Sequence, residues 1–336
     1  MSNPIFSLGW MLAGITDTSH LGQHHLASVR LRSAVCAQAL GNRGCSVAVG
    51  EEFSMRVDLL LIGKIGSDQV GNRAEQWIQE VRRLRKLGAR VVVDYTDHHL
   101  SQSGDLAQFY RDLFQVAHAL VVPSQAMSNM AHSLFQGCIE VIPEPLEVSI
   151  TPWVPRNSAG ITRALWFGHG SNLPYLIEFL LNWDSRNPGI FVDLYSNREA
   201  LQALARQNIR LPRGVRVDAS AWSLAAVQKA AKLAEFCILP AGFDDPRKAG
   251  ASANRLLTAL ALGLPVAADL LPAYSDFKDY FVDIRGQEFL NFLSDLQAQG
   301  DRVRAAQAEV LPAFERTLIE ERWYSVLSRL ISDARS

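Results

Sequence analysis

Several classes of protein are excluded by what this sequence lacks. Its 336 residues carry 33 Lys and Arg against 34 Asp and Glu, so there is no global basic field to attract nucleic acid. No segment approaches the roughly 18 to 20 continuous apolar residues that span a bilayer. The first residues, MSNPIFSLGWMLAGITDTSH, lack the basic region of a signal peptide. We therefore expect a cytoplasmic protein that binds no nucleic acid, and contact with a membrane surface stays open.

Cysteine is scarce, and its spacing favours neither disulfides nor zinc. The four cysteines, Cys36, Cys45, Cys138 and Cys237, are far apart, form no CxxC pair and lie within or beside apolar segments. Buried reduced thiols are the expectation, and no paired His and Cys spacing predicts a metal site.

Three nucleotide and hydrolase motifs are also missing. No GxGxxG follows the first apolar run, so a nicotinamide cofactor is unsupported. The stretch LLIGKIGSDQVG contains Gly63 and Lys64 without the spacing of a phosphate-binding P-loop. No GxSxG elbow of a serine hydrolase occurs. The sequence predicts no cofactor.

Short apolar runs alternate with helical patterns along the chain, which is typical of parallel α/β architecture. The runs expected to form strands span 5–13, 45–50, 57–63, 89–95, 119–124, 139–143, 164–168, 189–196, 215–220, 236–242, 265–269 and 280–285. Helices are expected near 28–41, 72–87, 104–117, 125–135, 173–185, 198–206, 223–233, 252–262 and 287–299, and 301–334 is expected to be purely helical.

The stretch 144–160 interrupts this alternation with three prolines after Pro143 and predicts a linker. It separates expected domains over 1–150 and 160–312, and 313–336 is expected to form a C-terminal helix. The predicted fold class is α/β, with two doubly wound, Rossmann-like domains facing across a cleft. Ligands bind such sheets outside the carboxyl ends of the strands, so the cleft is the expected site.

The segment KAGASANRLLTALALGLPVAAD, 248–269, places cations ahead of a short helix and a buried strand. Ser252 is a plausible N-cap, and the free backbone N–H groups of the first turn can bind an anion. Lys248 brings a point charge to a phosphate, and Arg255 can bind one with two parallel hydrogen bonds. Asn254 suits a ribose or sugar hydroxyl. A capped helix with two solvated cations is the alternative.

A second cluster ends the run VVVDYTDHHL, 91–100, where Asp94, Asp97, His98 and His99 follow three valines. A carboxylate or imidazole at a strand end can position an acceptor hydroxyl or take its proton. Helix capping, structural hydrogen bonding and metal binding are the alternatives left open.

Two further stretches offer polar groups beside predicted helices. In RALWFGHGSN, 163–172, either Ser171 or Asn172 can cap the next helix. In the helix over 28–41, Arg30 and Arg32 do not share a face, so at least one is expected to be a surface charge. Ser124 is expected to cap the helix that follows it.

Together, the strand and loop at LPAG, Lys248 and the run SANRLLTALALGLPVAAD resemble the donor-site segment of GT-B glycosyltransferases. The similarity is greatest to the large retaining group of the family 4 type, whose helix carries E-A-x-A-x-G-x-P-V. Many members of that group have two glutamates eight residues apart. Gly250 and Thr258 stand at those positions here, so Asn254 and Arg255 are the expected substitutes.

The resemblance also implies roles for the other patches. Gly168 and Gly170 would let the backbone approach the donor phosphates, where His169, Ser171 and Asn172 can form hydrogen bonds. The loop 16–25 and Arg30 would line the acceptor side together with Asp94. The segment 91–100 resembles a D-x-x-D-x-H region, and Asp97 and His98 within it are the catalytic candidates. The C-terminal helix would pack back on the first domain.

The resemblance implies a metal-independent transferase that moves a sugar from a nucleotide-sugar to a carbohydrate or other hydroxyl acceptor. The donor would be held by Gly168, His169, Ser171, Asn172, Lys248, Ser252, Asn254 and Arg255. Bacterial surface-glycan synthesis is the expected setting. A non-catalytic GT-B scaffold that binds a partner, and a sugar-nucleotide epimerase of the same fold, are the alternatives. The oligomeric state is not predicted.

Overall fold

The computed structural model describes residues 5–156, 161–184, 187–242 and 244–333. By its internal contacts the chain divides into two compact units. Unit 1 comprises Met1–Pro145, Pro246–Ser252 and Phe314–Ser336, and unit 2 comprises Leu146–Asp245 and Ala253–Ala313. The first boundary falls inside the expected linker 144–160, of which 157–160 lie outside the described residues. The segment Pro246–Ser252 lies with unit 1, although 160–312 was expected to form one domain.

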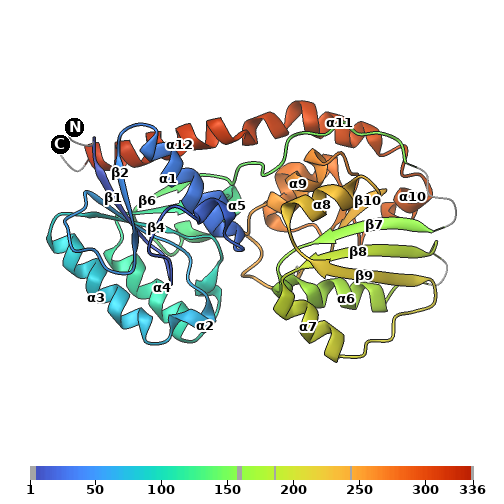
Figure 1. Ribbon diagram of the computed structural model, residues 1–336, viewed down its shortest axis with the longest axis horizontal. Helices are drawn as coiled ribbons and strands as arrows, with labels where there is room; N and C mark the ends of the chain where they lie inside the picture. Colours follow the sequence, from blue (N-terminus) through green and yellow to red (C-terminus); the bar gives the residue numbers. More distant parts are fainter. Residues whose placement is uncertain (1–4, 157–160, 185–186, 243, 334–336) are drawn as a thin grey trace. The chain divides into compact units, whose positions relative to one another are not determined.

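Unit 1 is built on a parallel six-stranded sheet with the strand order β2-β1-β3-β4-β5-β6 (Figure 1). Its strands are β1 (Ser7–Met11), β2 (Ser46–Gly50), β3 (Leu59–Ile62), β4 (Arg90–Asp94), β5 (Ala119–Val122) and β6 (Cys138–Val141). Each lies within the run that predicted it, apart from a residue or so at the ends. Central parallel strands are covered on both faces, which is why these runs are continuously apolar.

The helices of unit 1 cover both faces of this sheet. They are η1 (Leu21–Gln23), η2 (Val29–Ser33), α1 (Ala34–Gly41), α2 (Ser67–Val70), α3 (Arg73–Lys86), η3 (His99–Ser101), α4 (Asp105–Val116), α5 (Gln125–His132) and α12 (Arg316–Ser332). The expected helix over 28–41 begins as a π-helix, η2, and the short α2 was not predicted.

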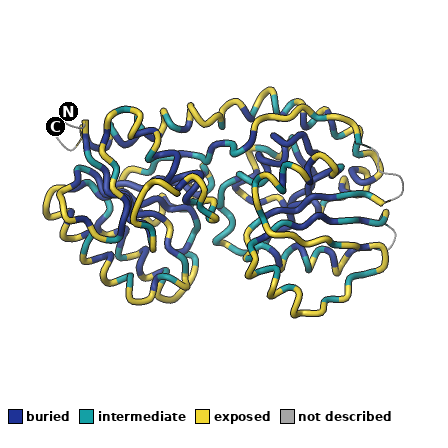
Figure 2. Tube along the Cα trace, viewed as in Figure 1, coloured by how far each residue is buried: buried dark blue, intermediate teal, exposed yellow. Residues whose placement is uncertain are grey.

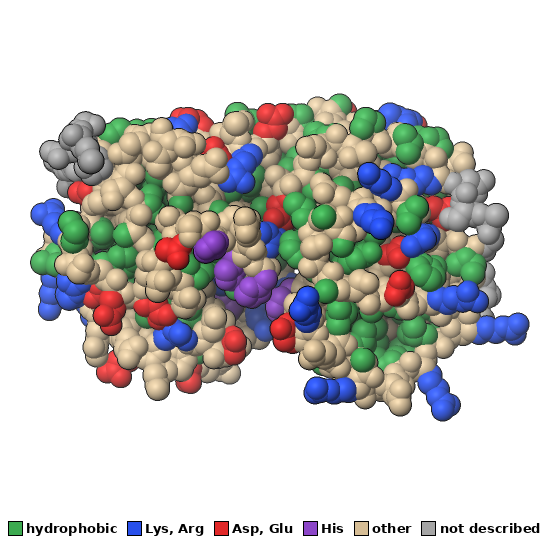
Figure 3. All heavy atoms as spheres, in the orientation of Figure 1, with side chains coloured by type: hydrophobic (Ala, Val, Ile, Leu, Met, Phe, Trp, Pro, Cys, Tyr) green, Lys and Arg blue, Asp and Glu red, His purple; other side chains and the backbone are tan. Residues whose placement is uncertain are grey.

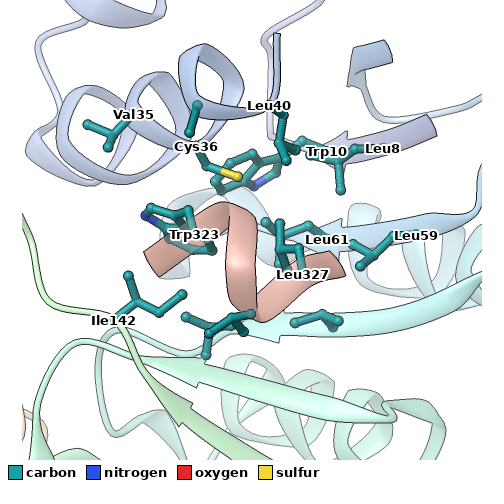
Figure 4. Close-up of a cluster of buried hydrophobic side chains, with 14 of the residues drawn as sticks. Leu8, Trp10, Val35, Cys36, Leu40, Leu59, Leu61, Ile142, Trp323 and Leu327 are labelled. Carbon is teal, nitrogen blue, oxygen red and sulfur yellow. The ribbon is translucent and has the colours of Figure 1, made fainter. Parts of the chain in front are cut away.

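Alternate residues of the central strands of unit 1 point to its two apolar layers. Leu59 and Leu61 belong to the layer formed with α1 and α12, whereas Leu60 and Ile62 belong to the layer formed with α3 and α4. In the first layer Trp323 of α12 packs against strand and helix side chains, as Figure 4 shows. The segment expected to return to the first domain thus supplies core residues of unit 1.

Unit 2 repeats this architecture with the strand order β12-β11-β10-β7-β8-β9, again all parallel. Its strands are β7 (Thr162–Phe167), β8 (Ile190–Ser196), β9 (Val215–Ala221), β10 (Phe236–Leu239), β11 (Val266–Ala268) and β12 (Val282–Asp283). Its helices are η4 (Gly170–Asn172), α6 (Leu173–Leu181), α7 (Arg198–Arg206), α8 (Leu224–Ala231), α9 (Asn254–Ala261), η5 (Pro272–Tyr280), α10 (Glu288–Ser294) and α11 (Gly300–Glu309).

The C-terminal tail is not one helix. A short 3-10 turn, η6 (Leu311–Phe314), separates α11 from α12, because Pro312 lacks the backbone N–H that a continuous helix needs. In both units the central strands are dark, buried segments of the trace, whereas the edge strands β2, β6 and β9 and the outer helix faces are partly or largely exposed (Figure 2). Over the described residues, no helix combines the length and apolarity needed to cross a membrane.

The strand orders fix where each sheet can bind a ligand. In unit 1 the order reverses at β1 and β3, and in unit 2 it reverses at β7 and β10. Loops leave the sheet in opposite directions at such a switch point and open a crevice at the carboxyl ends of the strands. Residues directly after these four strands are therefore the first candidates for binding.

Candidate functional site

The first candidate cluster lies at the carboxyl ends of β3 and β4 in unit 1. Lys64 follows β3, Asp97 follows β4, and their side chains form an ion pair. Lys248 places a second positive charge near Asp97. Burial of Asp97 favours the neutral acid, but the two lysines outweigh it and lower the pKa of Asp97 to about 2. Asp97 is therefore ionised at every pH near neutrality.

The pairing changes what Asp97 can do. A carboxylate with so low a pKa is a weak proton acceptor, but it is well suited to holding two ammonium groups in place. Burial opposes the charge of Lys64 as well, yet Asp97 outweighs that effect and raises the pKa of Lys64. The cluster is thus a fixed set of charges beside the switch point of unit 1.

Two histidines follow the ion pair, and two tyrosines hold them. The hydroxyl of Tyr95 lies 3.1 Å from Nδ1 of His98. The ring of His99 stacks on Tyr110 with centroids 4.8 Å apart. Burial lowers the pKa of His98 and brings the pKa of His99 to about 4. Both imidazoles are therefore mainly neutral at pH 7 and can accept a proton. Figure 3 shows histidine side chains gathered on the surface drawn there.

Asp94, predicted on the acceptor side, is 2% exposed. Its two carboxylate oxygens accept hydrogen bonds from Nε of Arg32 at 2.7 and 2.8 Å. Nη1 of Arg32 also donates to the backbone oxygen of Ile142 at 2.8 Å. This pair ties η2 to the ends of β4 and β6, directly beneath the loop that carries the histidines.

The prediction that Arg30 or Arg32 is a surface charge is wrong, because their exposed fractions are 9% and 0%. The two side chains leave η2 on different sides, as their spacing requires, but both sides are covered. Nη1 of Arg30 donates to the backbone oxygens of His24 and His25 at 2.8 and 2.9 Å. Arg30 thus holds the polar loop that was expected to line the acceptor side.

The segment 246–252 packs on unit 1 through its backbone. The hydroxyl of Ser124 donates to the backbone oxygen of Gly250 at 2.8 Å and also accepts from the N–H of Met127, the N-cap bond expected at α5. A Cβ at Gly250 would lie 2.5 Å from Cε of Met130 and 2.9 Å from Cα of Met127. Only glycine fits there, so this position, one of the two where a glutamate was looked for in the sequence, cannot hold a glutamate in this packing.

The second candidate cluster lies at the switch point of unit 2. Gly168 follows β7, and Arg255 reaches it from the first turn of α9. A Cβ at residue 168 would lie 3.1 Å from Nη1 of Arg255. That nitrogen is buried and has no hydrogen-bond partner among the residues that the structure describes. A buried guanidinium N–H without an acceptor is costly, so this one points to a missing anionic or acceptor group.

The loop after Gly168 is held by local hydrogen bonds. Nδ1 of His169 accepts from the backbone N–H of Ser171 at 3.2 Å, and the N–H of Gly170 donates to Oδ1 of Asn197 at 2.7 Å. The expected cap of α6 is absent: Asn172 is the N-cap residue, but its side chain makes no capping bond, and His169 caps the short η4 instead.

The start of α9 also differs from the prediction. The helix begins at Asn254, and its N-cap residue is Ala253, so Ser252 is not the cap. Ser252 belongs to the segment that packs on unit 1, which removes it from the first helical turn. Oδ1 of Asn254 accepts from the hydroxyl of Thr258 at 2.8 Å, and Thr258 is 3% exposed. The first turn of α9 therefore presents hydrogen-bond donors and no carboxylate.

Sequence reasoning missed three residues of these clusters. Lys64 was not considered further, because the glycines around it lack the spacing of a P-loop. A lysine that follows a buried strand could still have indicated a charge at the binding edge of the sheet. Arg30, and not Arg32, was predicted to line the acceptor side. Tyr274 of η5, whose pKa is raised by burial and lowered in part by the charge of Arg255, lies in a stretch with no motif. Within the described residues, no group of three or more His, Cys, Asp or Glu side chains could hold a metal ion.

No known family model matches the sequence, and no curated protein matches it. Several solved structures match over nearly their whole length, whereas the chain spans only 58% of the matched chain in the structure of the GtfA/B complex. A glycosyltransferase from Rickettsia africae ESF-5 gives a TM-score of 0.64 at 10% identity, with 98% of this chain and 99% of that chain covered.

Two others are similar. Sucrose-phosphate synthase from Thermosynechococcus elongatus gives a TM-score of 0.62 at 11% identity, with 98% of this chain and 100% of that chain covered. WaaG, a glycosyltransferase involved in lipopolysaccharide biosynthesis, gives a TM-score of 0.55 at 16% identity, with 94% of this chain and 99% of that chain covered. With two Rossmann-like parallel sheets and a C-terminal helix, this chain has the GT-B fold of these glycosyltransferases.

Proposed function

We propose that this protein is a glycosyltransferase that moves a sugar from a nucleotide-sugar donor to a hydroxyl group of a carbohydrate or another acceptor. The observation that carries the proposal is the buried Nη1 of Arg255 beside Gly168 at the switch point of unit 2, which has no hydrogen-bond partner among the described residues. The fold shared with several glycosyltransferases supports it.

The donor diphosphate is assigned to the end of β7 and the first turn of α9. Arg255 supplies a guanidinium that can bind two phosphate oxygens, and Gly168 leaves room for them because it has no Cβ. Asn254, His169, Ser171 and Asn172 add polar groups for the sugar or the ribose. Lys248 and Ser252, which belong to unit 1, are also assigned to the donor.

The acceptor is assigned to the strand ends of unit 1. His98 is neutral near pH 7 and is the better candidate there to accept a proton from an acceptor hydroxyl. Asp97 would act by holding Lys64 and Lys248, and Asp94 and Arg30 by holding the loops around them.

Negative charge develops on the leaving diphosphate in this reaction. We propose that Arg255, Lys248 and the backbone N–H groups of the first turn of α9 stabilise this charge and that the reaction needs no metal ion. We assign the reaction to the cytoplasm, in the assembly of bacterial surface glycans. Similarity to WaaG supports that setting, because WaaG is involved in lipopolysaccharide biosynthesis.

The direct test is calorimetric titration with UDP-, GDP-, dTDP- and CMP-sugars. One donor should bind, and Arg255→Ala should weaken it at least tenfold, as expected for the loss of a charge-assisted pair. Gly168→Ala should also weaken it, because the new methyl group would crowd Nη1. Arg206→Ala, at the far end of α7, is the matched control and should bind like the wild type. Binding of no donor by the wild-type protein would refute the proposal.

A second candidate, a non-catalytic scaffold that binds a protein or glycan partner, is favoured by one observation. Neither position of the glutamate pair carries a carboxylate, since Gly250 and Thr258 occupy them. Donor binding without transfer or hydrolysis, together with a stable protein partner, would favour the scaffold. A new sugar-nucleotide formed without any acceptor would identify an epimerase instead.

A further inference from the structure

Five positively charged side chains lie close together at the amino end of the unit 1 sheet, and we call them the basic patch. Arg82, Arg85 and Lys86 are exposed on the last turns of α3. Arg56 is exposed in the segment before β3, and Arg90, which is half-buried, begins β4. Within the described residues, none of the five forms an ion pair. Figure 3 shows Lys and Arg side chains gathered on the side of unit 1 that is drawn at the left.

Contacts among three segments of the chain hold the patch together. Arg82 and Lys86 are four residues apart and lie on one face of α3. The helix ends in a turn where the N–H of Gly88 donates to the backbone oxygen of Arg85 at 3.0 Å, and β4 begins two residues later. Gly88 has a φ of +94°, which lets the chain turn this sharply. Nη2 of Arg56 lies 3.3 Å from the place of a Cβ at residue 88, so Arg56 packs against the same turn.

The acidic side chains that flank the patch in the chain do not neutralise it. Glu80 pairs with Arg83 at 2.6 Å, and Glu52 acts electrostatically on the same arginine. Oδ2 of Asp58 accepts hydrogen bonds from the backbone N–H and the hydroxyl of Ser7, at 2.8 and 2.9 Å. The whole chain has a formal net charge of -1, so this surplus of positive charge is local.

Two apolar side chains are exposed within the patch. Met55 is 76% exposed and precedes Arg56, and Leu87 is 46% exposed and follows Lys86. A bilayer with anionic lipids offers a partner for both kinds of group. Lys and Arg side chains bind the phosphates of its headgroups, and apolar side chains enter the boundary between the headgroups and the acyl chains. A nucleic acid would satisfy the cations alone and leave both apolar side chains in water.

The dipole of α3 accounts for only part of the patch. The carboxyl end of a helix carries about half of a negative elementary charge, which attracts cations within the last turn. Arg85 and Lys86 are placed to offset that charge. Arg56 and Arg90 come from other segments and add to a charge that is already balanced. Five like charges repel one another, so keeping them together favours a negatively charged partner at this surface.

We propose that the basic patch binds the surface of a membrane that contains anionic lipids, with Met55 and Leu87 entering the headgroup region. The patch lies at the amino ends of β3 and β4, whereas Asp97 and His98 follow the carboxyl end of β4. The length of β4, roughly 15 Å, separates the two places. Contact with a membrane at the patch therefore leaves the candidate cluster of unit 1 uncovered. None of the residues assigned to the donor or the acceptor belongs to the patch, so membrane binding and sugar transfer can fail independently.

Sedimentation of the whole chain with lipid vesicles tests the proposal. One set of vesicles is pure phosphatidylcholine, and the other contains equal parts of phosphatidylcholine and phosphatidylglycerol. At low ionic strength the wild-type protein should bind the mixed vesicles and not the pure ones. Sodium chloride should release it, because salt screens the attraction between the patch and the lipid phosphates. Absence of binding to the mixed vesicles, or equal binding to both sets, would overturn the proposal.

A triple variant, Arg82→Gln with Arg85→Gln and Lys86→Gln, removes three of the five charges. Each cation near an anionic membrane surface changes the affinity about fivefold, so the partition coefficient should fall roughly a hundredfold. The matched control is a triple variant of three exposed cations of unit 2: Arg198→Gln, Arg206→Gln and Lys229→Gln. It should bind vesicles as the wild type does. Equal losses in the two triple variants would show that net charge governs binding and would overturn the role of the patch.

The exposed apolar side chains separate a membrane from another polyanion. The double variant Met55→Ser with Leu87→Ser should bind the mixed vesicles at least about tenfold more weakly, because the apolar burial is lost. A DNA duplex should bind the wild-type protein more weakly than the mixed vesicles do. Binding to DNA that is as tight as binding to vesicles, together with no effect of the double variant, would overturn the membrane assignment in favour of a nucleic acid.

Circular dichroism shows whether each variant is folded. If the triple variant of the patch does not fold, Lys86→Gln alone replaces it, because this side chain is exposed and its loss disturbs no ion pair within the described residues. The partition coefficient of Lys86→Gln should fall about fivefold. A value equal to that of the wild type would overturn the proposal.

Discussion

Replacing Asp97 by Asn tests the charge cluster of unit 1. Asp97 is paired with Lys64 and lies near Lys248, and its side chain is 14% exposed. The substitution keeps the size and removes the charge. We expect a loss of stability at pH 7 that becomes smaller as the pH falls.

The magnitude follows from the pKa of Asp97, which is about 2 in the folded protein and about 3.9 when unfolded. At about 1.4 kcal/mol per pKa unit, the difference corresponds to roughly 2.5 kcal/mol. Because the folded pKa is the lower one, this stability is fully present above the unfolded pKa. It is lost as the pH falls through the folded pKa, and roughly half of it remains at pH 3.

The assay is urea unfolding, followed by tryptophan fluorescence, at pH 7, 5, 4 and 3. The free energy of unfolding of Asp97→Asn should be lower than that of the wild type by about 2 to 3 kcal/mol at pH 7 and by about half of that at pH 3. Asp276→Asn is the control, because Asp276 is exposed and has no ion pair within the described residues. The free energy of unfolding of Asp276→Asn should stay close to that of the wild type at every pH.

A difference at pH 7 that persists unchanged to pH 3 would refute the reasoning. The substitution would then act through packing and not through charge. A difference near zero at pH 7 would mean that solvent, and not the lysines, sets the charge state of Asp97. The same pKa predicts that activity has no acid limb due to Asp97 between pH 5 and 9.

Three other substitutions test the packing around the two clusters. Arg32→Met leaves the buried Asp94 without a partner and should cost about 3 to 5 kcal/mol in urea unfolding; a cost below 1 kcal/mol would show that water reaches the carboxylate. Gly250→Ala places a methyl group against Met127 and should cost about 1 to 3 kcal/mol and speed tryptic cleavage in 246–252; wild-type cleavage would mean that this segment is not held by packing. Trp323→Ala should cost about 3 to 5 kcal/mol, because the ring is fully buried in the first core layer; an unchanged midpoint would contradict that placement.

The strands could be predicted because their signal is local. A run such as Val91–Val93 must be covered on both faces, and only a central parallel strand gives it that cover. The helix expected near 72–87 is found as α3, and its buried Trp77, Val81 and Leu84 have the spacing of one helix face. Alternation of such segments then indicated two parallel α/β sheets.

The candidate site could be predicted only in part, because it depends on contacts far apart in the sequence. Ser252 has the right chemistry for an N-cap, but the packing of 246–252 on unit 1 removes it from the helix. Lys64 gains its partner, Asp97, only when the chain is folded. No periodicity or motif carries that information.

The two positions that lack glutamate can now be understood from the packing. Gly250 has no space for any side chain, because a Cβ there would meet Met127 and Met130. Thr258 is buried, and its hydroxyl donates to Oδ1 of Asn254. A carboxylate at either position would be buried without a partner and would cost several kcal/mol. Under the proposed function, recognition at the start of α9 therefore falls to hydrogen-bond donors, of which the guanidinium of Arg255 is the strongest.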